Sequence, residues 1–130
     1  EGGQPFFQGE VEACINGRIL NLGAYFGEPC EALLERLLSE QLEDGGWNCE
    51  APPSVRSSFH STICVLEGLL QYERANGATP ALTAARARGE AYLLERRMLR
   101  KQSSGEVTTP GPGSRSRPAI TTTCCAGWTI

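Results

Sequence analysis

The chain lacks several features that would each point to a particular class of protein. It has no run of about 18 consecutive apolar residues, so the sequence predicts no transmembrane segment. Residues 1–10 have neither the basic start nor the apolar stretch of a signal peptide, and no Met stands at position 1. We therefore expect a processed chain or a piece of a longer protein. No glycine-rich phosphate loop and no nucleophile elbow occur, which argues against those two kinds of catalytic site.

Charge of either sign is also modest. The chain has 12 Lys and Arg against 15 Asp and Glu, a net charge of −3. This value is too small to indicate a nucleic-acid or anionic-membrane partner. One basic cluster falls late in a predicted helix, where it suits the negative end of the helix dipole: Arg96, Arg97, Arg100 and Lys101.

Cysteine is present, but below the density of a small disulfide scaffold. The six residues are Cys14, Cys30, Cys49, Cys64, Cys124 and Cys125. Three of them, Cys14, Cys30 and Cys64, fall on predicted apolar helix faces, where a free thiol behaves as a small hydrophobe. We therefore expect a reducing, cytoplasmic setting.

Apolar residues recur at the 3.6-residue period in four segments, and no segment has a convincing strand pattern. In the first, Val11, Ile15, Ile19, Leu22 and Phe26 form one helix face. Capping and stop signals give four predicted helices, at residues 10–26, 29–44, 57–76 and 79–103. The prediction is two helical hairpins joined by a longer loop that contains Pro52 and Pro53.

The two hairpins form a weak internal repeat at a spacing of roughly 50 residues. The segment from Ile19 to Phe26 can be laid over that from Val65 to Tyr72. The segment that follows the second predicted helix and ends in Trp47 corresponds to the segment that follows the fourth predicted helix and ends in Val107.

The exit of the second predicted helix carries a recognisable motif. Leu37, Gln41, Gly45 and Trp47 stand at the spacing L-x-x-x-Q-x-x-x-G-x-W. This pattern resembles the QW motif of the terpenoid cyclase and protein prenyltransferase superfamily, the squalene-cyclase-like proteins. Arg36 stands where the motif usually has an aromatic residue.

The second copy keeps only its first half, from Arg88 to Leu93, because Arg97 and Val107 replace the Gln and the Trp. The resemblance covers about residues 6–107 and implies an α/α toroid, of which this chain would hold two incomplete repeats. A Gln side chain can satisfy backbone groups at helix ends, and a Trp ring buries a large area. We therefore expect Gln41 and Trp47 to be structural rather than catalytic.

Few residues are candidates for chemistry. His60, the only histidine, is a candidate base or ligand, and Asp44 is a second candidate catalytic group. The resemblance to prenyltransferases implies a zinc set of Asp44, Cys49 and His60. No local zinc signature supports it, and Cys49 with His60 alone leaves too few ligands, so we expect no metal and keep zinc as the alternative. Arg56 is a candidate ligand for a diphosphate or carboxylate.

From Thr108 the composition changes to proline, glycine, serine and threonine, which is typical of a disordered end. A second interpretation is a frameshift. Back-translating residues 113–130 and reading one nucleotide earlier can give RFSFPTRYHYDVLRGLDY, whose last seven residues parallel Val65 to Tyr72.

The sequence thus predicts an all-α fold: helical repeats at residues 1–107 and an irregular tail at 108–130. The resemblance implies that the full-length parent processes an isoprenoid and binds this apolar ligand in the toroid. The alternative is a non-catalytic toroid that acts as a scaffold or binding module. Because repeats missing from the chain would leave apolar helix faces uncovered, we also expect self-association.

Overall fold

A computed structural model of the chain describes residue 9 and residues 11–97. Four α-helices follow one another in this part of the chain, and it contains no strand. They are α1 (Ala13–Phe26), α2 (Glu31–Ser39), α3 (Phe59–Asn76) and α4 (Pro80–Glu95). The predicted all-α class is therefore confirmed for the described residues. The boundary at residue 107, the tail and the frameshift hypothesis lie outside them.

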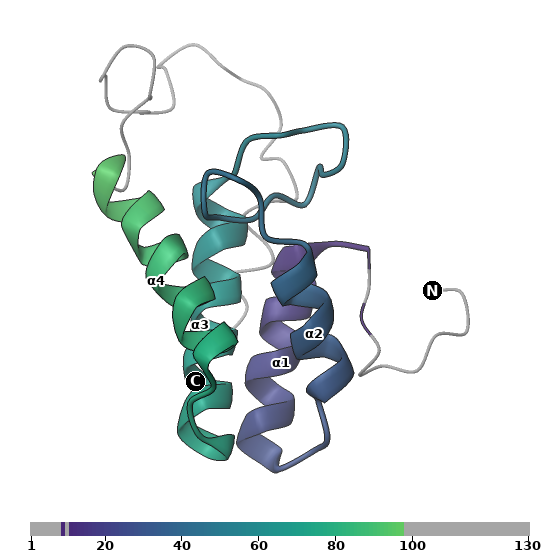
Figure 1. The fold of residues 1–130 in the computed structure, drawn as a ribbon. Helices are drawn as coiled ribbons and strands as arrows, with labels where there is room; N and C mark the ends of the chain where they lie inside the picture. Colours follow the sequence, from purple (N-terminus) through teal and green to yellow (C-terminus); the bar gives the residue numbers. More distant parts are fainter. Residues whose placement is uncertain (1–8, 10, 98–130) are drawn as a thin grey trace, which may run out of the picture.

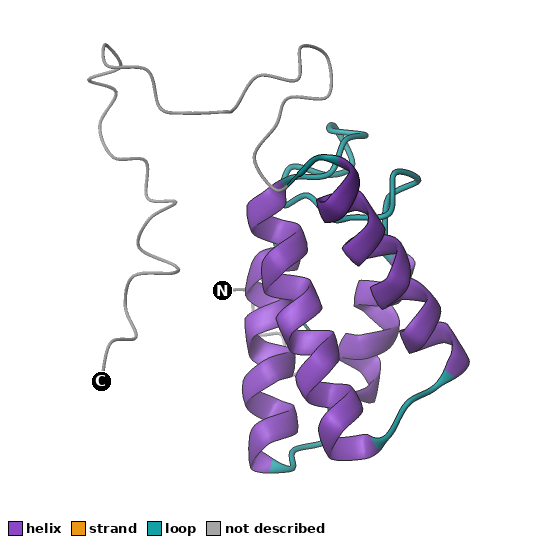
Figure 2. Cartoon of the chain, turned by 90° about the vertical axis from the view of Figure 1, so that its left-hand side faces the viewer, coloured by secondary structure: helices purple, strands orange, loops and turns teal. Residues whose placement is uncertain are grey.

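The helices form two hairpins whose short turns lie at the same end of the molecule (Figure 1). The longer segment between α2 and α3 crosses the opposite end (Figure 1). Helices α1 and α3 therefore run in one direction, and α2 and α4 run in the other. The most extensive packing is between α1 and α3, which belong to different hairpins. Helix α2 packs against α1 and α4 packs against α3. Figure 2 shows this all-helical arrangement turned by 90°.

The N-termini of α3 and α4 follow the predicted capping signals. The Ser58 side chain accepts a hydrogen bond from the Ser61 N–H, which caps α3. The Thr79 side chain likewise accepts from the Leu82 N–H, and Pro80 is the first residue of α4. Both arrangements satisfy backbone donors that a helix start leaves open.

The other boundaries differ from the prediction by several residues. Helix α1 begins at Ala13 rather than at residue 10, although Gly27 ends it in the left-handed conformation, as expected. Helix α2 spans only Glu31–Ser39, because Pro29 precedes the N-cap residue and turns replace the helix after Ser39. Helix α4 ends at Glu95, and Arg97 takes a positive φ of 46°, which cannot continue a helix.

Small residues allow α1 and α3 to approach closely. A β-carbon built at Gly68 would lie 2.3 Å from the carbonyl oxygen of Gly17. One built at Gly17 would lie 2.5 Å from the carbonyl oxygen of Cys64. Both distances are below any real contact, so the crossing requires glycine at both positions.

Only part of the apolar face predicted for α1 packs in the core. The core contains Leu20, with Ala13 and Ala24 beside it. From the predicted face, Ile19 is buried in this core and Ile15 packs against it, whereas Val11, Leu22 and Phe26 are exposed. Helix α1 is therefore apolar on two sides, because small and branched residues fill the core side while larger ones point outward.

Candidate functional site

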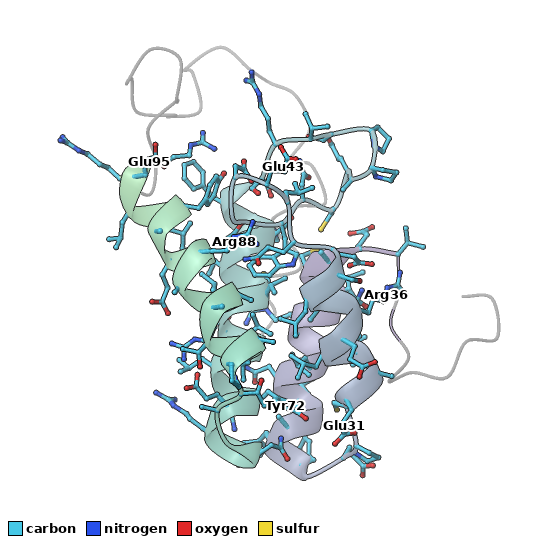
Figure 3. The ribbon with its side chains drawn as sticks, in the orientation of Figure 1. Glu31, Arg36, Glu43, Tyr72, Arg88 and Glu95 are labelled. Atoms are coloured by element: carbon cyan, nitrogen blue, oxygen red, sulfur yellow. The ribbon has the colours of Figure 1, made fainter. Side chains whose placement is uncertain are left out.

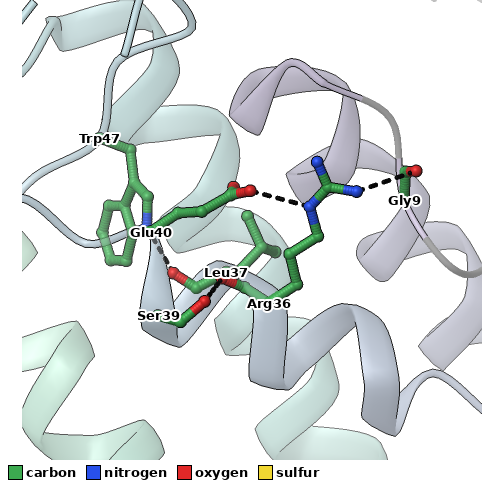
Figure 4. A network of polar contacts seen from close by, with 6 residues as sticks. All are labelled: Gly9, Arg36, Leu37, Ser39, Glu40 and Trp47. Carbon is green, nitrogen blue, oxygen red and sulfur yellow. Dashed lines mark hydrogen bonds and ion pairs between the residues drawn. The ribbon is translucent and has the colours of Figure 1, made fainter. Parts of the chain in front are cut away.

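The segment that resembles the QW motif is an anchor between the two hairpins. The Trp47 ring is completely buried, and its Nε1–H donates a hydrogen bond of 2.7 Å to the carbonyl of Leu37 (Figure 4). The ring approaches α4 so closely that a β-carbon at Gly89 would lie 3.0 Å from its Cζ3. The expected burial of Trp47 against the end of α2 is confirmed.

Gln41 links this segment to α4. Its Nε2 donates hydrogen bonds to the carbonyls of Gly45 at 2.7 Å and Ala85 at 2.8 Å. Its Oε1 accepts a bond of 3.1 Å from Arg88 of α4, which is labelled in Figure 3. Arg88 also donates to the carbonyl of Leu42. The expected bonding of Gln41 to backbone is therefore confirmed, and one of its partners lies in the other hairpin.

Gly45 completes the anchor by letting the turn touch α4. Its φ is +94°, and a β-carbon would lie 2.7 Å from the carbonyl oxygen of Arg88. Both the conformation and the contact exclude a side chain at this position.

The departure from the motif at Arg36 has a structural explanation. The Arg36 Nε pairs with Glu40 at 2.8 Å, and its Nη1 donates to the carbonyl of Gly9 at 3.1 Å (Figure 4). Arg36 therefore ties the segment before α1 to α2, a contact that an aromatic side chain cannot make.

Asp44, a candidate catalytic residue, binds a neighbouring loop. Its carboxylate accepts hydrogen bonds from the backbone N–H and the hydroxyl of Ser57. The carbonyl of Ser57 in turn accepts a 2.6 Å bond from the Tyr92 hydroxyl. Burial is the main cause that raises the pKa of Tyr92 above its ordinary value of 10. Asp44 thus holds the start of α3 against the turn after α2.

The other candidates for chemistry are separated. The side chain of Arg56 is exposed on the loop before α3, where its carbonyl accepts a 2.7 Å bond from Asn48. His60 is half-buried in the first turn of α3 and lines an apolar cavity. Neither residue lies in a group with Asp44 that resembles a catalytic set.

Cys49 is brought to the start of α1 rather than to His60. Its Sγ accepts hydrogen bonds from the Cys14 N–H at 3.2 Å and the Ser61 hydroxyl at 3.1 Å. The donor atoms of Glu12, Cys14 and Cys49 all lie within 4.8 Å of one another. Among the described residues, this is the group of three metal-ligating side chains that the fold assembles, and it includes neither Asp44 nor His60.

Sequence reasoning missed Cys14 and Glu12 as partners of Cys49. Cys14 had been placed on an apolar helix face, and its sulfur is indeed buried. Burial raises the pKa of the Cys14 thiol well above its ordinary value, and the neighbouring Cys49 adds to this effect. The contact spans 35 residues of chain, and no local spacing signals it.

The cavity beside Cys14 has a volume of about 200 Å³ and a largely apolar lining. It lies between α1 and the first turns of α3, on the side of α1 that carries the predicted apolar face. Its lining residues are Cys14, Ile15, Arg18, Ile19, Leu22, His60 and Cys64. At its edge, Arg18 pairs with Glu67 of α3 at 2.6 Å. A second cavity, of about 330 Å³, lies under the loop at residues 48–55 and is more polar.

Comparison of the chain with protein-family models, with curated proteins and with solved structures found no match. No helix among the described residues is both long and apolar enough to cross a membrane.

Proposed function

We propose that this chain is a helical-repeat part of an α/α-toroid protein and that it binds an apolar, isoprenoid-like chain on the outward face of α1. The observation that carries the proposal is the apolar cavity between α1 and α3. The motif from Leu37 to Trp47 supports the toroid assignment, since it closes the end of one hairpin against the next.

The outward face of α1 extends beyond the cavity as an apolar surface. Leu22 is 39% exposed, and Tyr25 and Phe26 are each 71% exposed. Leu22 and Phe26 stand on the same side of the helix as Ile15 and Ile19, because positions three and four apart share a face, and Tyr25 lies beside them. A helix that is apolar all round normally has cover on both sides. An apolar ligand, extended along this face, would provide the cover that the described residues do not.

The cavity favours binding over catalysis by this part of the chain. Its polar side chains are Arg18, which pairs with Glu67, and His60, and the rest of the lining is apolar or carries a thiol. Asp44 is engaged with Ser57, and Arg56 is on an exposed loop. Isoprenoid processing would therefore depend on residues outside the described part of the chain. The alternative is a module that binds or scaffolds without catalysis.

Binding can be tested with farnesol, a C15 isoprenoid alcohol, by following amide chemical shifts in NMR spectra of the full chain. We expect the shifts to concentrate at α1 and the first turns of α3. Leu22→Gln should weaken binding about tenfold, since roughly 1.4 kcal/mol of apolar contact corresponds to that factor. Leu94→Gln is the matched control, because Leu94 is 75% exposed on α4 and does not line the cavity.

Equal effects of the two substitutions, or shifts spread over the whole chain, would refute the proposal. Self-association through the same face is the competing explanation for its exposure. Sedimentation of the two variants without farnesol distinguishes ligand binding from self-association. If Leu22 lies in a dimer interface, Leu22→Gln should change the mass of the particle and Leu94→Gln should not.

A further inference from the structure

We propose that Glu12, Cys14 and Cys49 form a binding site for a single Zn²⁺ ion. The inference does not depend on the apolar ligand proposed above. It starts from the meeting of two thiols and a carboxylate at the N-terminus of α1, with all donor atoms within 4.8 Å of one another.

The separations suit tetrahedral coordination. Bonds of about 2.3 Å to sulfur and about 2.0 Å to oxygen place two sulfur ligands of one ion roughly 3.8 Å apart. The two sulfur atoms therefore need to close by about an ångström at most. The Cys14 sulfur already lies 3.6 Å from Oε2 of Glu12.

The position of Cys49 is fixed by the fold. It follows the buried Trp47 by two residues, and the Trp47 N–H donates to the Thr62 hydroxyl at 3.0 Å. The Cys49 N–H donates to the Ser61 hydroxyl at 3.2 Å. The chain is thus attached to α3 at Trp47 and again at Cys49, so the Cys49 sulfur needs no large ordering step to meet α1.

Two hydrogen bonds also orient the Cys49 sulfur toward the start of α1. The Cys14 N–H belongs to the first turn of α1, where backbone donors and the helix dipole favour negative charge. The Ser61 hydroxyl provides the second bond. Such contacts around a metal ligand orient it and tune its basicity.

Glu12 is available to the ion because it does not cap the helix. It occupies the N-cap position of α1 but makes no capping hydrogen bond with its side chain. It is exposed, Cys49 is half-buried and Cys14 is buried, so an ion can enter from solvent beside the carboxylate.

The chemistry of the donors selects the metal. Thiolates favour zinc and other soft ions over Mg²⁺ and Ca²⁺, which prefer oxygen ligands. Three protein ligands leave the fourth tetrahedral position for water. The sequence-based expectation of no metal rested on Cys49 and His60 alone, and the structure adds two ligands to Cys49.

The test uses the reduced, metal-free full chain without oxygen. Cys124 and Cys125 lie outside the described residues, so both are replaced by serine to remove their thiols from the measurement. Co²⁺ is titrated as a spectroscopic substitute for zinc, because thiolate ligands give a charge-transfer band and tetrahedral geometry gives intense visible bands. Zn²⁺ should then displace Co²⁺, and elemental analysis should give one zinc per chain.

Substitutions decide which residues hold the ion. Cys49→Ala should abolish the charge-transfer band, and Cys30→Ala, at a buried thiol outside the group, should keep it. Glu12→Gln should weaken Co²⁺ binding at least tenfold, and Glu28→Gln, at an exposed position beyond the other end of α1, should not. Since Glu12 is exposed, its variant tests the site even if Cys49→Ala disturbs folding. Absence of the band, or affinities unchanged by Glu12→Gln and Cys49→Ala, would overturn the proposal.

Discussion

Replacing Gly68 by alanine has two opposing effects on the stability of the fold. In an isolated helix, alanine is more stable than glycine by about 1 kcal/mol, so propensity alone predicts stabilisation. In the folded chain, the added methyl group would lie 2.3 Å from the carbonyl oxygen of Gly17. The obstacle is backbone in the middle of α1, and no side-chain rotation can move it away.

The steric effect should dominate. Relief requires α1 and α3 to separate by about an ångström along their main interface, which loosens contacts of Val65 and Leu20. Overpacking of a core typically costs about 1–3 kcal/mol. With a backbone obstacle we expect the upper end of that range, and after the gain in propensity a net loss of about 2 kcal/mol in the free energy of unfolding.

Urea unfolding followed by circular dichroism measures this quantity. Ala84→Gly, at an exposed position of α4, is the control for propensity and should cost about 1 kcal/mol. A Gly68→Ala chain as stable as the wild type, or more stable, would show that the helices do not cross at Gly17. A Gly68→Ala chain that is unfolded even without urea would show a loss of stability of the expected sign but of greater magnitude.

Three further predictions concern the anchor between the hairpins. Trp47→Ala should lower the free energy of unfolding by about 3–5 kcal/mol in the same assay, because the ring is fully buried; a loss under 1 kcal/mol would contradict this. Gln41→Ala leaves the carbonyls of Gly45 and Ala85 without their amide donor and should cost about 1–3 kcal/mol, whereas Gln41→Glu retains only the acceptor and should not restore it. The raised pKa of Tyr92 adds to the free energy of unfolding; this contribution is complete below pH 10 and is lost as pH rises through the folded-state pKa. Tyr92→Phe should therefore lose less stability at alkaline pH than the wild type, and equal losses in both chains would refute this role of Tyr92.

The sequence was informative where one residue determines a local conformation. Ser58, Thr79 and Pro80 predicted the starts of α3 and α4, because capping depends on atoms within a few residues. Gly27 likewise predicted the end of α1. The motif spacing also predicted the burial of Trp47 and the backbone bonds of Gln41.

Contacts between distant segments could not be predicted in the same way. Periodicity identified a real apolar face of α1, but it could not say which of two apolar faces packs against the core. The core face is built from small residues such as Gly17 and Ala24, which contribute little to a hydrophobic pattern. The meeting of Cys14 with Cys49 depends on how the loop attaches to α3, and this has no local signature.

The dominance of the α1–α3 interface has a consequence for synthesis of the chain. Roughly 50 residues separate the end of α1 from the end of α3. At ordinary elongation rates, α1 emerges about 3–10 s before its main partner is complete. During this interval both apolar sides of α1 face water, and α2 covers only part of one. We therefore expect a nascent chain that stalls within the loop to be the form most exposed to aggregation.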